Sequence, residues 1–247
     1  MQPNGPAARS QLDSARQRFN ARSGPRWRFA RAVTNFLRHR VCDLPLTVHG
    51  FEHVPHGEPL IVAAAPHRNG MDAFLLFHAL PIEPRLYFLG SREAVARRPL
   101  SRLAIDLFGG MVPVATAGQL NREALEVALA ILADGASLGI FPEGADLASL
   151  PDDRLAPIKR GVAFLALRSG RRVLPVGLPN SRELWRGRSL EISIGPPLQP
   201  PTDGNSRERE AALVANLVQA LERLRPPART APPPQARQWR WLSHLVG

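Results

Sequence analysis

The chain has 247 residues, is 44% hydrophobic and carries a formal net charge of +11. This is enough apolar material for one sizeable core, and no run approaches the roughly 20 uninterrupted apolar residues that span a bilayer. Cys42 is the single cysteine, which excludes an internal disulfide and a thiolate metal cluster and makes a packing role the expected one.

The positive charge is almost entirely arginine, since Lys159 is the only lysine among the 32 basic residues. Such a surface attracts polyanions, either nucleic acid or anionic lipid head groups, and composition does not choose between them. The N-terminus lacks the apolar segment of a secretory signal, so we expect a non-spanning protein on the cytoplasmic side.

Taken in chain order, residues 1–24 are polar and basic, and we expect little order there. Residues 25–41 place Trp27, Ala30, Val33 and Leu37 at helical spacing between arginines, which predicts a basic amphipathic helix. Two interpretations remain open: the helix binds a membrane surface, or it docks on the core through its apolar stripe.

The middle of the chain alternates short apolar strands with helices. Strands are expected at 46–48, 60–64, 86–90, 112–114, 138–141, 173–177 and 190–194, the last as an edge strand, and helices at 71–80, 119–134, 161–167 and 207–224. This alternation predicts an α/β sandwich in which a mixed, largely parallel sheet is flanked by helices. We expect one domain over 25–225, followed by a proline-rich linker and a Trp/Arg tail at 226–247 that suits a membrane interface.

Two polar residues lie at the turn between an expected strand and an expected helix. His67 and Asp72 are five positions apart, which in a continuous helix would turn their side chains about 140° away from each other. A loop through Asn69 and Gly70 would instead bring the carboxylate to the imidazole. Histidine is suited to general-base work near neutral pH, and a carboxylate on one ring nitrogen fixes the tautomer.

A second block ends another buried strand in an abrupt turn. Phe141-Pro142-Glu143-Gly144 places Glu143 at the carboxyl end of a strand, where open α/β sheets bind ligands. Downstream, Ile158–Gly161 opens a helix and Val173–Val176 forms the next strand.

In the order and spacing of these blocks the sequence resembles the glycerophospholipid acyltransferases, which include bacterial lysophosphatidic acid acyltransferases. The His-x4-Asp block is matched by His67 and Asp72, and the Phe-Pro-Glu-Gly block by Phe141–Gly144. The Phe-Lys-x-Gly stretch resembles Ile158–Gly161, and the Val-x-Pro-Val strand is matched by Val173–Val176. The resemblance covers roughly residues 45–200.

The resemblance implies acyl transfer from acyl-CoA or acyl carrier protein to an acceptor hydroxyl, with no further cofactor, no metal and no acyl-enzyme. His67 and Asp72 would be the catalytic pair. The implied substrate-binding residues are Phe141, Pro142, Glu143, Gly144, Arg68, Arg92, Lys159 and Pro175. Membrane lipids and the acyl donor are the expected partners, nucleic acid is not, and the expected location is peripheral on the cytoplasmic face of a membrane.

Two positions depart from the family pattern. Thr116 and Asp146 stand where the family has arginines that hold the acceptor's phosphate, and neither side chain grips phosphate as arginine does. Arg68, Arg92, Lys159 and Arg160 are candidates for replacement charge.

The leading hypothesis is therefore an acyltransferase acting on a lysophospholipid such as 1-acylglycerol-3-phosphate. Alternatives are the same chemistry on a phosphate-free acceptor (an amino-lipid, a glycolipid or a lyso-ornithine-type lipid) and a catalytically silent lipid-binding member. A basic nucleic-acid-binding protein accounts for the charge but for neither motif.

Overall fold

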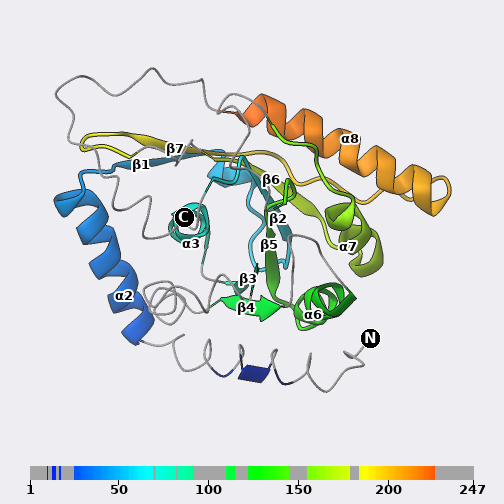
Figure 1. Cartoon of the computed structure of the whole chain (residues 1–247), viewed down its shortest axis with the longest axis horizontal. Helices are drawn as coiled ribbons and strands as arrows, with labels where there is room; N and C mark the ends of the chain where they lie inside the picture. Colours follow the sequence, from blue (N-terminus) through cyan, green and yellow to red (C-terminus); the bar gives the residue numbers. More distant parts are fainter. Residues whose placement is uncertain are drawn as a thin grey trace.

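The computed structural model describes residues 10, 13, 14, 17, 25–68, 71–81, 83–91, 110–114, 122–144, 155–178 and 184–225. A seven-stranded sheet runs through the centre of this part of the molecule, with helices on both faces (Figure 1). The expected N-terminal segment 1–24 lies almost entirely outside the described residues, and the tail at 226–247 lies wholly outside them.

The sheet confirms the α/β class expected from the sequence. Its strands, in spatial order, are β1 (Leu46–His49), β7 (Leu190–Ile194), β6 (Val173–Gly177), β2 (Ile61–Ala65), β5 (Ser137–Ile140), β3 (Leu86–Ser91) and β4 (Met111–Val114). Every neighbouring pair is parallel except β6 and β7, which run antiparallel. The central strands β2 and β6 are buried at every position, as continuous apolar runs in parallel sheets usually are.

The two faces of the sheet carry separate cores. On one face, α6 (Arg122–Ala133), α7 (Gly161–Ser169) and α8 (Ser206–Leu224) pack on residues such as Ile61 and Ala63. On the other, α3 (Met71–Ala79) packs on Val62 and Ala64. Alternate residues of β2 therefore serve opposite cores, following the two-residue period of a strand.

The expected role of residues 190–194 as an edge strand is wrong. β7 lies between β6 and β1, and β1 forms that edge of the sheet. The alternating burial of β7 is real, with Leu190, Ile192 and Ile194 buried. Alternation reports that one face of a strand is more exposed than the other, and it does not report how many neighbours the strand has.

The N-terminal amphipathic segment forms α2 (Pro25–Phe36) and continues as one π-helical turn, η1 (Leu37–Val41). The helix docks through polar groups. An Arg31 Nη donates to the carbonyl of His78 in α3 at 2.8 Å, and Thr34 Oγ1 lies 3.3 Å from His78 Nε2. The buried Arg38 donates to the Leu44 carbonyl and to Asn35.

The apolar side of the same segment faces outward. Phe29 is 71% exposed and Phe36 is 60% exposed, and Val33, Leu37 and Val41 are exposed too. In the part of the chain that the structure describes, the one other exposed large apolar side chain is Phe51, in the short 3-10 turn η2 (Phe51–His53). Docking through an apolar stripe containing Val33 and Leu37 is therefore wrong. The side chains of Trp27 and Ala30 are not among those described.

Candidate active site

The His-x4-Asp and Phe-Pro-Glu-Gly blocks meet at one edge of the sheet. His67 follows the end of β2, and Phe141 follows the end of β5. β2 and β5 are neighbouring parallel strands, so their carboxyl ends lie side by side. This is the edge at which parallel α/β sheets place their binding sites.

His67 and Asp72 are in direct contact, as their spacing predicts. His67 Nδ1 lies 3.0 Å from Asp72 Oδ2, and Asp72 is fully buried in the first turn of α3. The backbone N–H of Arg68 donates to the same oxygen at 2.6 Å. Because a carboxylate accepts hydrogen bonds, Nδ1 carries the proton and Nε2 is left as the acceptor of the neutral imidazole.

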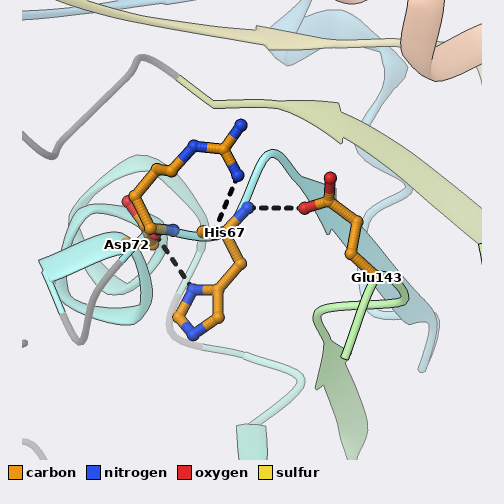
Figure 2. Close-up of polar contacts among 4 residues, drawn as sticks. His67, Asp72 and Glu143 are labelled. Carbon is orange, nitrogen blue, oxygen red and sulfur yellow. Dashed lines mark hydrogen bonds and ion pairs between the residues drawn. The ribbon is translucent and has the colours of Figure 1, made fainter. Parts of the chain in front are cut away.

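Glu143 is buried on the backbone side of His67. The residue is only 4% exposed. Oε2 accepts a hydrogen bond from the His67 N–H at 2.8 Å, and Oε1 accepts one from the Ala156 N–H at 2.8 Å. Figure 2 shows His67 between two carboxylates, with Asp72 on its ring and Glu143 on its backbone.

An aromatic row leads from α3 to the candidate base. The ring of Phe141 is stacked on the His67 imidazole, with centroids 3.8 Å apart and planes 10° apart. Phe88 of β3 stacks on Phe141 at 5.7 Å, and Phe77 of α3 meets Phe88 edge-on at 5.3 Å. Three phenyl rings thus form a continuous apolar wall that ends on His67.

Lys159 lies beside the Pro-Glu-Gly turn. Its backbone N–H donates to the Pro142 carbonyl at 2.9 Å, and its exposed side chain passes over Gly144. Gly144 has a φ of +87°, and a Cβ there would collide with the Lys159 ammonium group. The exposed lysine side chain could move aside, so it is the positive φ of this turn that favours glycine.

The remaining expected site residues are spread out. Arg68 lies next to the pair, where one of its guanidinium nitrogens is 3.2 Å from the His67 carbonyl oxygen. Pro175 lies inside β6 in register with Ala63, within the sheet rather than at its carboxyl edge. Arg92, Thr116 and Asp146 lie outside the described residues.

The described ranges offer little support for metal, membrane-spanning or thiol chemistry. Among them, no three His, Cys, Asp or Glu side chains gather as metal ligands would, and none of the helices there is long and apolar enough to cross a bilayer. Cys42 is partly buried against the core, and this burial raises the pKa of its thiol. A raised thiol pKa disfavours the thiolate nucleophile, in keeping with the packing role expected from the sequence.

A family model now identifies the chain. The model of the Acyltransferase family matches residues 45–179, which is more than half of the sequence and includes both blocks of the site. The chain belongs to the Acyltransferase family.

One curated relative carries the same activity in its name, and one solved structure shares the fold. A 1-acyl-sn-glycerol-3-phosphate acyltransferase of Cocos nucifera is 26% identical over 172 residues, covering 66% of this chain and 51% of that protein. The chain thus spans about half the length of this curated relative. The crystal structure of the 1-acyl-sn-glycerophosphate (LPA) acyltransferase PlsC from Thermotoga maritima superposes with a TM-score of 0.55 at 21% identity, covering 76% of this chain and 75% of that one. The second likeness is one of fold.

Some features of the candidate site were not expected from the sequence. The N–H of Ala156 joins the site through Glu143, and the Phe141 ring covers the imidazole. A backbone N–H carries no residue signature, so nothing in the sequence marks position 156. The stacking can be predicted in part from the sequence. Phe141 follows β5, and β5 is the neighbour of β2, the strand that leads to His67.

Proposed function

We propose that this chain transfers a fatty acyl group from a thioester donor to the hydroxyl of a lysophospholipid resembling 1-acylglycerol-3-phosphate. The observation that carries the proposal is the contact between His67 Nδ1 and Asp72 Oδ2 at 3.0 Å. It leaves Nε2 as a base on a side chain that is 25% exposed.

In the proposed reaction, Nε2 takes the proton of the acceptor hydroxyl while the oxygen of that hydroxyl attacks the thioester carbon. The carbon–sulfur bond then breaks, and the imidazolium returns its proton to the departing thiolate. Asp72 stabilises the imidazolium between these two steps because its carboxylate faces Nδ1. The hydroxyl attacks directly, so the proposal contains no acyl-enzyme, and the donor is acyl-CoA or acyl carrier protein.

A phosphate-bearing acceptor is supported by the charge around the site. The Arg68 guanidinium lies on the His67 backbone and the Lys159 side chain lies over Gly144, and both are cationic groups that suit a phosphate. Thr116 and Asp146 favour the second candidate, the same transfer to a phosphate-free lipid, because the usual arginines are missing there.

We also propose that the protein works as a peripheral enzyme on a membrane surface, with residues 25–225 as its acyltransferase domain. The support is the outward apolar face of α2 and η1, which we define as Phe29, Val33, Phe36, Leu37 and Val41. Arg28 and Arg40 are exposed on the same segment and suit anionic head groups. The active site would then reach a lipid acceptor that stays in the bilayer.

The test is acyl transfer by the purified chain. Acyl-CoA and acylated acyl carrier protein, each radiolabelled in the acyl group, are offered with a panel of lysolipids, with and without phosphate, to the wild type, to His67→Ala and to His56→Ala. His56 is exposed and lies outside the site, so its variant is the matched control. Label entering one lipid with the wild type and His56→Ala but not with His67→Ala supports the proposal, and the labelled lipid identifies the acceptor class. No transfer from either donor, with vesicle binding intact, favours a silent lipid-binding protein.

A further inference from the structure

The side chain of Glu143 has no access to a substrate. Both of its oxygens accept backbone N–H groups at 2.8 Å, one from His67 and one from Ala156. The residue is 4% exposed, so the carboxylate is covered as well as bonded. An acceptor lipid binding at the exposed face of His67 would therefore not contact Glu143 directly.

The two hydrogen bonds of Glu143 hold two segments of chain that have no regular structure. His67 lies between the end of β2 and the start of α3, where its N–H has no strand or helix partner. Ala156 lies in the extended segment that leads into α7. A buried N–H needs an acceptor, and here one carboxylate supplies it to both segments.

The turn that carries Glu143 is itself held in place. The Gly144 N–H donates to the Phe141 carbonyl at 3.2 Å, and the Lys159 N–H donates to the Pro142 carbonyl at 2.9 Å. From this turn Phe141 stacks on the His67 ring while Glu143 holds its backbone. With Asp72 on Nδ1, His67 is restrained at its backbone, at its ring face and at one ring nitrogen.

We infer that Glu143 is a positioning residue, whose carboxylate holds His67 against the segment entering α7 and does not bind the acceptor. The inference rests on the proposed function, in which Nε2 of His67 is the base. Fixing the His67 backbone sets where Nε2 lies, and a misplacement of about 1 Å can lower a catalytic rate by about 10²-fold. Loss of Glu143 should therefore lower kcat and leave acceptor binding intact.

The experiment compares Glu143→Gln and Glu143→Asp with the control Glu222→Gln, which loses only an ion pair with Arg225 at the end of α8. Glutamine keeps the shape but presents an NH2 group to one of the two N–H donors, and aspartate is one methylene too short to reach both. We expect kcat to fall about 10- to 100-fold in both Glu143 variants. The acceptor KM should stay within about twofold of wild type, as should the preference between phosphate-bearing and phosphate-free acceptors. A raised acceptor KM at unchanged kcat, or an altered acceptor preference, would overturn the inference.

A second readout does not depend on activity. The ring nitrogen and Nδ1 proton signals of His67, assigned by their loss in His67→Ala, are followed by nitrogen-15 NMR. They should shift, with faster exchange of the Nδ1 proton, in Glu143→Gln and remain in place in Glu222→Gln; unchanged His67 signals in Glu143→Gln would sink the inference. If the wild type transfers no acyl group at all, the proposed function fails while this measurement still decides the positioning role.

A backbone variant covers the case in which the Glu143 variants do not fold. Lactic acid introduced in place of Ala156 by cell-free translation replaces the N–H with an ester oxygen and leaves every side chain as it is. This removes the Oε1 partner and keeps the bond to His67. We expect a smaller fall in kcat, about 3- to 10-fold, at unchanged acceptor KM. An unchanged kcat would contradict the link between Glu143 and the α7 segment.

Discussion

Phe141 and His67 lie face to face, with ring centroids 3.8 Å apart and planes inclined by 10°. Phe141 follows β5 and His67 follows β2, so the stack joins the two neighbouring strand ends that form the site. A flat apolar ring on one face of the imidazole limits its rotation and excludes water from that side. A stacked ring also interacts favourably with the imidazolium that forms when the base takes a proton.

Replacing Phe141 with leucine should lower kcat by about 2- to 10-fold, because an aromatic pair contributes about 0.5–1.5 kcal/mol beyond its buried area. Phe141→Tyr keeps the stack and should remain close to wild type. Steady-state acyl transfer measures both, with Phe51→Leu in η2 as a control on an exposed phenylalanine. Equal rates for the leucine and tyrosine variants would mean that stacking does not support the base.

Replacing Asp72 with asparagine should be far more damaging to activity than to folding. The amide is nearly isosteric, yet it no longer demands that Nδ1 carry the proton, and it leaves the imidazolium without a facing charge. We expect kcat to fall by about 10²- to 10⁴-fold. The variant is compared with Asp203→Asn, an exposed position before α8. A loss under tenfold at saturating substrate would argue against a histidine base supported by Asp72.

Much of this arrangement could be predicted from residue patterns. The apolar runs located all seven strands to within a residue or two, and the spacing of His67 and Asp72 around an Asn-Gly turn predicted their contact. These features follow from local periodicity and turn chemistry, which are properties of contiguous residues.

Other features depend on partners distant in the chain. β7 is interior because β1, about 140 residues earlier, pairs with it. Periodicity identifies the two faces of α2 but not which of them has a partner. In the structure, Arg31 and Thr34 contact His78 in α3. The bond between Glu143 and the Ala156 N–H has no residue signature at all.

The outward apolar face of α2 and η1 predicts the effect of removing its phenylalanines. Fully burying one Phe side chain contributes about 1.5–3 kcal/mol, so Phe29→Ser combined with Phe36→Ser should weaken vesicle binding by about tenfold or more. Co-sedimentation with anionic phospholipid vesicles measures this. Ala32→Ser, exposed on the same helix, is the matched control. Vesicle binding that is equal in all three proteins would place the membrane contact elsewhere.

The lowered pKa of His78, at the junction of α2 and α3, predicts a loss of stability in mild acid. Burial, together with the nearby Arg31 and Arg38 charges, lowers the pKa of His78 from 6.5 to about 4. The unfolded chain therefore binds more protons than the folded one between these values. Stability contributed by neutral His78 is present in full above pH 6.5 and is lost progressively as the pH falls toward 4.

The matched comparison is His78→Gln, which keeps a hydrogen-bonding group near Thr34 but does not titrate. The free energy of unfolding from urea titrations should fall by about 1–3 kcal/mol more in the wild type than in His78→Gln between pH 6.5 and pH 4. His56→Gln, which removes an exposed histidine, should follow the wild-type curve. Parallel curves for wild type and His78→Gln would show that His78 takes up its proton in the folded protein as readily as in the unfolded chain.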